Sequence, residues 1–274
     1  MNINKVMVVI PMYNAEEHIA ETIQSVLNQT FKNFSLIIVD DKSNDKSVEI
    51  ASSFSDSRIK IIKNNERLGF FENWNKSLQQ IDAEYGKILP HDDILHPKCL
   101  ESQVSILENH KNVVLVHCNR KIIGVNGKSL SKKINFSNYG IKNLKDSIRN
   151  IFLNGTNTIG EPGAVLFRTS AINKIGSFSS DNQYTIDIDY WIRLLEFGDR
   201  FFQKETLYSF RVWEKSISTI LKNDQANSMK KFLRKMYYKY PKYVNKKDLF
   251  IGYMMCHFNE KCRRLAYKYL GLKS

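Results

Sequence analysis

Short apolar runs alternate with amphipathic stretches over the first part of the chain. The runs are rich in Val and Ile and too short for helices, so they predict buried parallel strands. They cover 6–10, 36–39, 59–62 and 87–89. The segments between them repeat apolar residues at three- and four-residue spacing, which predicts helices over 16–27, 46–54 and 70–80. This order predicts an α/β fold with a parallel sheet and right-handed crossovers.

Polar residues follow three of these predicted strands. They are Tyr13 and Asn14 after the first, Asp40 and Asp41 after the second, and Asp92 and Asp93 after the fourth. Ligands of open α/β sheets bind at the carboxyl ends of the strands, so these side chains are expected to share one site. Asn14 is also expected to cap the helix that follows it.

The second half of the chain is less regular. Its pattern predicts helices over 97–109 and 189–197 and strands over 113–117, 161–168 and 201–212. The dipeptide Asn126-Gly127 predicts a hairpin turn within 122–130. After Asn223 the pattern becomes helical, basic and aromatic, with a break at Pro241. We therefore predict a main domain over 1–221 and a basic amphipathic helical extension over 222–274.

Composition is that of a globular protein, but charge is unevenly distributed. The chain has 274 residues, with 42% apolar residues, 25% charged residues and a formal net charge of +13. The segment 222–274 contains 14 Lys and Arg against 3 Asp and Glu, a net charge of +11. A basic tail on a nearly neutral body indicates an anionic partner, either a membrane face or nucleic acid. A solvated helical tail is the alternative.

Cysteine usage and hydropathy bear on location. The four cysteines are scattered and lack zinc-site spacing, which is typical of a reduced cytosolic protein. The N-terminal residues lack the layout of a signal peptide, and no stretch approaches the roughly 20 apolar residues of a membrane span. We therefore expect a cytoplasmic protein that can lie on a membrane and does not cross it.

Five blocks of sequence resemble the family 2 inverting glycosyltransferases. They are Val8–Asp45, Leu89–Pro97, Gly160–Arg168, Asp187–Leu194 and Ser209–Ser218. The resemblance implies a GT-A fold, with a nucleotide-sugar-binding half over 1–97 and an acceptor-binding and catalytic half over 98–221. It further implies sugar transfer from a nucleotide-diphosphate donor, in bacterial surface-polysaccharide synthesis.

The resemblance places the nucleoside beside the ends of the first two strands. It implies that Pro11, Tyr13 and Asn14 line the nucleoside pocket, where the Tyr13 ring offers a flat face to a base. Asp41 matches the Asp that contacts the base, and its alternative role is a helix cap. A carboxylate that accepts from an imide N–H favours uracil or thymine, and hence a UDP- or dTDP-sugar. Arg67 either approaches the base or a phosphate or is a surface residue.

The acidic pair Asp92-Asp93 is the predicted metal site. Mn²⁺ or Mg²⁺ binds carboxylate and phosphate oxygens and neutralises a diphosphate. We predict Asp92 as the metal ligand, with Asp93 and His91 near the donor sugar. The family's usual D-x-D-D is incomplete here, because Pro90 replaces its first Asp. An acidic turn in which Asp93 caps a helix is the alternative.

An inverting transfer also requires a base for the acceptor hydroxyl. The resemblance places it at Asp187, six residues before an Arg, with Asp189 as the second candidate. The Glu that usually precedes this Asp is replaced by Ile186, and both carboxylates could instead stabilise a helix N-terminus. Glu161 is expected near the donor sugar or acceptor. Arg211 is expected at the diphosphate, although Trp213 replaces the His that often follows it.

Two further functions remain open at this point. A nucleotidyltransferase usually needs a glycine-rich loop after the first strand, and Pro11–Glu17 has no Gly. A non-catalytic sugar-nucleotide or membrane-binding module is compatible with Pro90 and Ile186. The basic and aromatic extension suits the inner face of an anionic membrane and a saccharide or lipid-linked acceptor. No nucleic-acid-binding motif is present, so nucleic acid is not expected as a partner.

Overall fold

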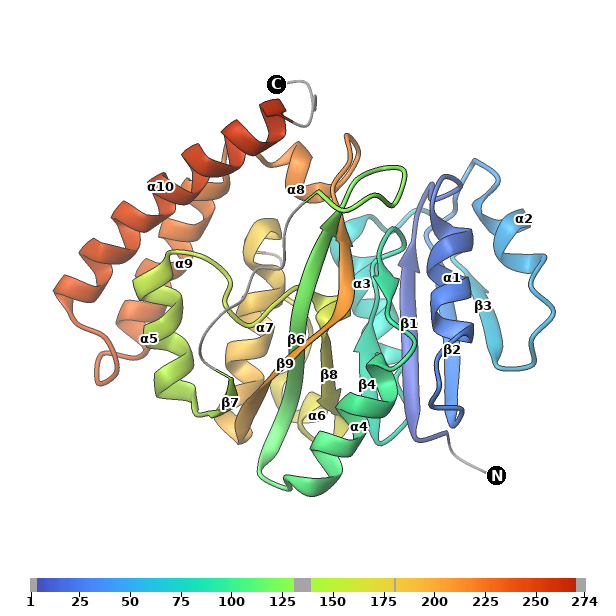
Figure 1. Ribbon diagram of the computed structural model, residues 1–274, viewed down its shortest axis with the longest axis horizontal. Coiled ribbons are helices and arrows are strands. Elements are labelled where there is room, and N and C mark those ends of the chain that lie inside the picture. The colour runs from blue at the N-terminus through green and yellow to red at the C-terminus, as the bar shows by residue number, and fades with distance from the viewer. Residues whose placement is uncertain (1–3, 131–138, 180, 270–274) are drawn as a thin grey trace.

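A mixed sheet of nine strands forms the centre of the protein in this computed structural model (Figure 1). The structure describes residues 4–130, 139–179 and 181–269. The strand order is β3-β2-β1-β4-β8-β6-β9-β5, and β7 pairs with β9. Helices cover both faces of the sheet. The predicted α/β class is confirmed, and so is the helical C-terminal region.

The N-terminal half follows the predicted alternation of strands and helices. The strands β1 (Val6–Met12), β2 (Phe34–Asp40), β3 (Ile59–Lys63) and β4 (Tyr85–Ile88) are parallel. The connecting helices are α1 (Ile19–Leu27), α2 (Ser47–Ser52) and α3 (Phe70–Gln79). Strands β1 and β2 are buried on both faces, which is why their sequences are continuous apolar runs.

The prediction that Asn14 caps the first helix is wrong. Helix α1 begins at Ile19, and its cap position is His18, which makes no side-chain capping bond. Asn14 adopts a positive φ of 46°. Its Oδ1 accepts a hydrogen bond from Asn44 N at 3.0 Å, and its own N–H donates to Ser43 Oγ at 3.0 Å. Asn14 therefore ties together the loops that follow β1 and β2.

The second half adds further helices and five strands, which pair antiparallel except for the long parallel pair of β6 and β9. Its elements are β5 (Ile94–Leu95), α4 (Cys99–Asn109), β6 (Val113–Ile123), β7 (Gly140–Lys142), α5 (Leu144–Asn154), β8 (Val165–Arg168), α6 (Ile172–Ile175), α7 (Ile186–Leu194) and β9 (Asp199–Arg211). The predicted strand over 161–168 starts only at Val165, because Pro162–Ala164 form a 3₁₀ turn. The turn at Asn126-Gly127 is present, with Gly127 at φ 71°.

Helix α5 was not predicted, although its sequence carries a start signal. Asn143 Oδ1 accepts a hydrogen bond from Asp146 N at 2.9 Å and so caps the helix. The helix ends at Gly155, whose φ of 56° suits glycine. Its buried residues Ile148, Ile151 and Phe152 belong to a hydrophobic cluster that also contains residues of β8 and α7.

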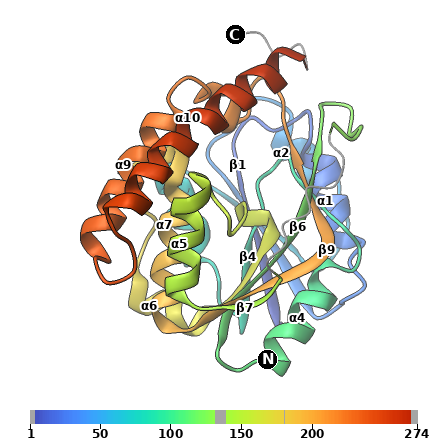
Figure 2. The same cartoon turned by 60° about the vertical axis from the view of Figure 1, so that its left-hand side comes forward.

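The C-terminal helices pack onto the body of the protein. They are α8 (Ile217–Ile220), α9 (Gln225–Lys239) and α10 (Lys246–Tyr269), and the predicted break at Pro241 separates the last two. Figures 1 and 2 show α10 along the outside of α9 and α5, and the packing contacts agree. Phe232, Leu233 and Met236 of α9 belong to the same buried cluster as Trp191 of α7. The division of the chain near Leu221 stays a prediction.

Two large buried clusters flank the sheet, and a small third one contains Val9, Ile37 and Val39. One of the large clusters contains Val6, Val8 and Ile10 of β1 and residues of α1 and α4. The other large cluster contains residues of β8, α5, α7, α9 and α10. Among the described helices, none combines the length and apolar character needed to span a bilayer.

Candidate active site

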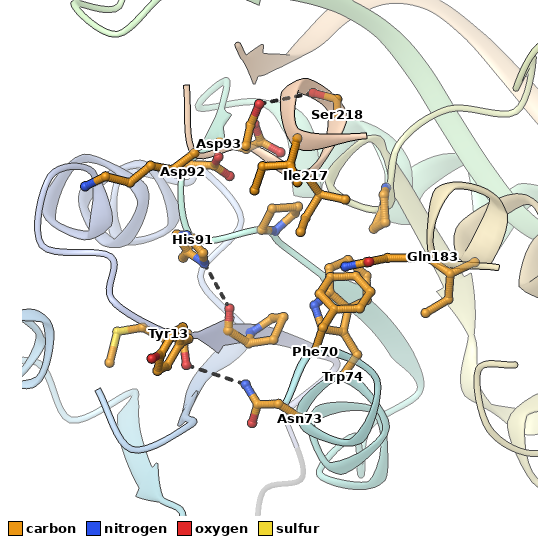
Figure 3. A pocket seen from close by; sticks show the side chains of 18 of the residues that line it. Tyr13, Phe70, Asn73, Trp74, His91, Asp92, Asp93, Gln183, Ile217 and Ser218 are labelled. Carbon is orange, nitrogen blue, oxygen red and sulfur yellow. Dashed lines mark hydrogen bonds between the residues drawn. The ribbon is translucent and has the colours of Figure 1, made fainter. Parts of the chain in front are cut away.

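A large cleft opens where β1, β2 and β4 end, and the second half of the chain forms its far wall (Figure 3). Its volume of about 680 Å³ is within the usual range for ligand sites. Ten of the twelve predicted site residues line it, and Asp189 and Arg211 do not. The ten are Pro11, Tyr13, Asn14, Asp41, Arg67, His91, Asp92, Asp93, Glu161 and Asp187. Segments far apart in sequence are thus brought to one site.

One end of the cleft combines a buried carboxylate with a stacked pair of side chains. Asp41 accepts hydrogen bonds from Asn64 Nδ2 at 3.0 Å, Leu68 N at 2.7 Å and Gly69 N at 2.9 Å. These bonds fix the loop that carries Arg67. The Arg67 guanidinium lies 4.1 Å from the centre of the Tyr13 ring. This end therefore presents a flat cationic and aromatic surface beside a carboxylate.

Asp93 lies in the wall of the cleft rather than free within it. Its side chain is fully buried and accepts hydrogen bonds from the Tyr208 hydroxyl and, at 2.8 Å, from Arg211 N. Burial raises the pKa of the Asp93 carboxyl well above its usual range, and the neighbouring charge of Asp92 raises it further. These bonds fix the end of β9 against the acidic turn.

Asp92 is the carboxylate of this pair that faces the cleft. It is half-buried, and its Oδ2 accepts a hydrogen bond from Trp213 Nε1 at 2.6 Å. Its Oδ1 accepts no hydrogen bond from the residues that the structure describes. Trp213 in turn packs edge-on against His18, with ring centres 4.7 Å apart. One oxygen of Asp92 is therefore held in place while the other remains available to a ligand.

Arg211 lies beneath the site, which disagrees with the predicted contact to a diphosphate. Its side chain is fully buried. Its Nε donates to the Asp92 carbonyl at 2.7 Å, its Nη1 donates to Val125 O at 2.7 Å and Gly124 O at 3.1 Å, and its Nη2 pairs with Glu21. The sequence spacing could not show this, because all these partners come from distant segments. Arg211 therefore positions the acidic turn.

Asp187 projects into the cleft from the first turn of α7. It is half-buried and accepts hydrogen bonds from Asn157 Nδ2 at 2.8 Å and Ile188 N at 2.7 Å. Burial raises the pKa of Asp187 to about 7, and the negative charge of Glu161 contributes in the same direction. Glu161 itself pairs with Arg120 at 3.1 Å. A carboxyl group with this pKa can accept a proton near neutral pH.

Asp189 has a different environment from Asp187. It is buried and forms ion pairs with Arg193 at 2.9 Å and with Lys235 of α9 at 3.2 Å. It does not line the cleft. Its carboxylate therefore connects α7 to α9.

Replacing Asp189 with Asn should lower stability and leave catalysis largely intact. Removal of one member of two partly buried ion pairs is expected to cost about 1–2 kcal/mol of unfolding free energy. Thermal and denaturant unfolding would measure this cost, and turnover should remain within about threefold of wild type. A loss of turnover as large as that of Asp187→Asn, without unfolding, would contradict the distinction between the two residues.

Known proteins resemble this chain in sequence. The family model described as glycosyl transferase family 2 matches residues 7–176, which is more than half of the chain. The chain belongs to this family. An uncharacterized glycosyltransferase of Rickettsia typhi is 31% identical to it over 208 residues, which is 76% of this chain and 64% of that relative. Another, from Methanocaldococcus jannaschii, is 31% identical over 212 residues, covering 76% of this chain and 70% of the relative.

Solved structures agree on the fold of this family 2 glycosyltransferase. S. aureus TarS 1-349 superposes with a TM-score of 0.67 at 17% identity, over 93% of this chain and 72% of that one. The complex of TarS 1-349 with UDP-GlcNAc superposes with a TM-score of 0.67 at 19% identity. The match covers 85% of this chain and 66% of that one. A third structure is the mannosyltransferase PcManGT of Pyrobaculum calidifontis in complex with GDP-Man and Mn²⁺. It superposes with a TM-score of 0.64 at 15% identity, over 98% of this chain and 76% of that one. The fold is therefore of the GT-A type.

The residues of this family 2 glycosyltransferase permit a divalent ion at Asp92 only together with a donor. Among the residues that the structure describes, no three His, Cys, Asp or Glu side chains gather as a metal site. Mg²⁺ in phosphate-transfer sites is often held by one or two carboxylates, with phosphates and water supplying the other ligands. Asp92, with one oxygen available, meets that requirement. A resident ion without a donor is not supported by these side chains.

Several residues in the cleft or directly beside it were missed by the sequence patterns. Asn157 orients Asp187, and its Oδ1 accepts from Ile159 N and Gly160 N. Lys215 lines the cleft, is exposed, and pairs with Glu17 at 2.6 Å. The apolar wall was missed as well; it includes Phe70, Trp74, Tyr184, Ile217 and Ile220. Of these residues, only Lys215 could have been suggested by the sequence, because it lies in the loop after the strand predicted over 201–212.

Proposed function

We propose that this family 2 glycosyltransferase moves a sugar, with inversion, from a UDP- or dTDP-sugar to a saccharide or lipid-linked acceptor. The observation that carries the proposal is the cleft in which three features lie together. These are the carboxylate and stacked pair around Asp41, the available oxygen of Asp92, and the half-buried Asp187. The UDP-GlcNAc complex of TarS supports a uridine nucleotide, and the Mn²⁺ in PcManGT supports a metal.

The nucleoside binds at the end of the cleft that contains Tyr13 and Arg67. A carboxylate oxygen has two acceptor directions, so Asp41 can accept from an imide N–H as well as from the loop. Pro11 and Asn14 form the adjacent backbone. Lys215 lies at the cleft edge, where a cation can pair with the diphosphate in the role first expected of Arg211.

The transfer step depends on residues at the opposite wall. Asp187 accepts the proton of the acceptor hydroxyl as that oxygen attacks the anomeric carbon, and Asn157 holds the carboxylate in position. Glu161 and His91 contact sugar hydroxyl groups. Asp92 would hold Mn²⁺ or Mg²⁺, which when bound neutralises charge on the departing nucleoside diphosphate. Asp93 supports this arrangement from within the wall.

The cellular role is also part of the proposal. Cell-surface polysaccharide synthesis in the cytoplasm, beside the inner face of the membrane, suits the resemblance and the basic charge of 222–274. The chain spans about two thirds of the length of the Rickettsia relatives, 64% for each. The activity of those longer proteins is not assigned to this chain.

A panel of sugar nucleotides tests the proposed reaction. UDP- or dTDP-sugars should release nucleotide in the presence of Mn²⁺ or Mg²⁺, and GDP-sugars should be at least about tenfold poorer. Binding without release would indicate a non-catalytic module. Release of pyrophosphate from a nucleoside triphosphate and a sugar phosphate would indicate a nucleotidyltransferase.

Replacing Asp41 with Asn should change the choice of base. The Asn amide can donate to N3 of cytosine and loses the acceptor for the imide of uracil, so UDP binding should weaken by about tenfold. CDP binding should weaken less or improve, which provides an internal control for disturbance of the loop. Calorimetric titration of both nucleotides measures the ratio. An equal loss for UDP and CDP would show that Asp41 only supports the loop.

A further inference from the structure

The outer face of α10 carries a stripe of exposed side chains. Phe250, Met254, Phe258 and Leu265 are 68%, 59%, 58% and 69% exposed. Together with the exposed Lys261 and Lys268 they follow one another at three- and four-residue intervals. Residues at this spacing share one side of a helix. Four large apolar side chains on one solvent-facing stripe form an apolar patch that a soluble domain rarely leaves uncovered.

The opposite face of α10 is fixed by close packing, so the stripe cannot turn inward. A Cβ added at Gly252 would lie 2.8 Å from Leu233 of α9 and 3.0 Å from the Phe152 carbonyl of α5. Asn259 Nδ2 donates to Asn154 O at 2.7 Å, and Cys256 is fully buried. These contacts hold the helix against α9 and α5 (Figure 2). The outer face of α10 is therefore the part of the helix that remains for another partner.

The charge of this face selects the partner. The exposed positions of α10 include five basic residues and no acidic one among the described residues. The five are Lys246, Lys247, Lys261, Arg264 and Lys268. Two acidic residues of the helix lie elsewhere: Asp248 is buried, and Glu260 is largely covered and pairs with Arg264 at 3.6 Å. Apolar side chains between lysines suit the boundary of anionic headgroups and acyl chains.

The same helix borders the catalytic cleft. The Arg263 guanidinium lies 5.9 Å from the ring centre of Tyr184, which lines the cleft. Cys256 Sγ lies 3.6 Å from Gly155 O, two residues before the Asn157 that orients Asp187. The inner face of α10 thus contacts the wall of the cleft, and a surface bound to the outer face is separated from that wall by this helix.

We propose that the outer face of α10 docks on an anionic lipid bilayer and holds the cleft beside the membrane surface. The apolar side chains enter the headgroup boundary, and the surrounding lysines pair with lipid phosphates. This inference goes beyond the proposed reaction, because docking requires neither donor nor acceptor. It adds a defined face to the general membrane contact proposed for 222–274.

The full-length protein and vesicles provide the test. Protein should co-sediment with vesicles that contain about 30% phosphatidylglycerol and much less with pure phosphatidylcholine, and high salt should weaken the binding. The triple variant Phe250→Ser, Met254→Ser, Phe258→Ser should lose at least about tenfold in partitioning. The pair Lys261→Glu and Lys268→Glu should lose a similar factor. Ile141→Ser, an exposed apolar residue on β7, is the matched control and should bind like wild type.

Cys262 offers a direct readout of docking. It is exposed on α10, whereas Cys99, Cys118 and Cys256 are buried. An environment-sensitive fluorophore on Cys262 should shift to shorter wavelength with anionic vesicles and not with neutral ones. Thermal unfolding and nucleotide release without vesicles check that each variant is folded and active, which separates this test from that of the proposed reaction.

Two outcomes would overturn the proposal. The first is that the triple variant and the charge-reversal variant both bind vesicles as strongly as wild type. The second is a wild-type dimer in sedimentation that the triple variant converts to monomer, with no change in vesicle binding; this would make the face a contact between two copies of the chain.

Discussion

Replacing Asp187 with Asn is expected to lower turnover by about 10²–10⁴-fold and to leave the affinity for the nucleotide nearly unchanged. Asn has almost the same shape and can keep a hydrogen bond to the backbone of Ile188, but it cannot accept a proton from the acceptor. The nucleoside end of the cleft, around Asp41, is built from other segments. Steady-state kinetics and nucleotide titration would separate the two effects. Wild-type turnover in the folded variant would remove Asp187 from the mechanism.

The dependence of wild-type activity on pH should report the titration of Asp187. The pKa of Asp187 is raised to about 7, mainly by burial, and the base must be ionised to act. Activity is therefore expected to be low below pH 7 and to rise through about 7 toward a plateau. The residual activity of Asp187→Asn should lack this rise. An unchanged profile in the variant would assign the titration to another group.

As the pH rises, the stability of the wild-type protein should fall while its activity rises. The folded-state pKa of about 7 exceeds that of an unfolded Asp, near about 3.9, so ionisation opposes folding as pH rises above the lower value. The full difference corresponds to roughly 4 kcal/mol, and we expect only about 1–2 kcal/mol because the carboxyl borders an open cleft. Asp187→Asn should thus be more stable than wild type at pH 8, an advantage that shrinks as the pH falls below 7. A merely structural carboxylate would give a less stable variant.

The N-terminal half could be predicted because its signals are local. Strands buried on both faces read as apolar runs, and the crossovers place their ends at one edge of the sheet. Tyr13, Asp41 and Asp92 could therefore be grouped from the sequence alone. The roles of Asp92 and Asp93 could be separated only by burial, since Asp93 is bonded to Tyr208 and Arg211 from the distant strand β9.

Predictions from spacing were less reliable where a side chain's partners come from remote segments. Arg211 had the right place in sequence for a phosphate contact, but the Asp92 and Val125 carbonyls and Glu21 surround its guanidinium. Asp189 differs from Asp187 by two positions, which on a helix turns it toward Lys235 of α9. Neither environment has a local signature. The start signal of α5 at Asn143 was local and could have been used.

Replacing Asp92 with Asn is expected to lower turnover by about 10²–10³-fold. Trp213 Nε1 can still donate to the amide oxygen, so the acidic turn should keep its shape and the protein its stability. What is lost is the negative charge that would hold Mn²⁺ or Mg²⁺ against the diphosphate. The expected readout is nucleotide release over a range of Mn²⁺ concentrations, in which the variant does not recover at saturation. Asp82→Asn, at an exposed loop position, is the matched control.

A second measurement separates a metal role from a purely electrostatic one. Since Asp92 is the one available carboxylate of the acidic turn, binding of Mn²⁺ should depend on the presence of UDP in wild type and be weakened at least about tenfold in Asp92→Asn. Calorimetry or the Mn²⁺ resonance signal detects this without turnover. A metal chelator could leave nucleotide release by the wild type unchanged, and Asp92→Asn could be as impaired with chelator as with metal. The Asp92 carboxylate would then act directly on the sugar or the protein. That result would fit the absence of Asp at Pro90 and of His at Trp213, which are two of the positions where the sequence departs from the pattern of the family.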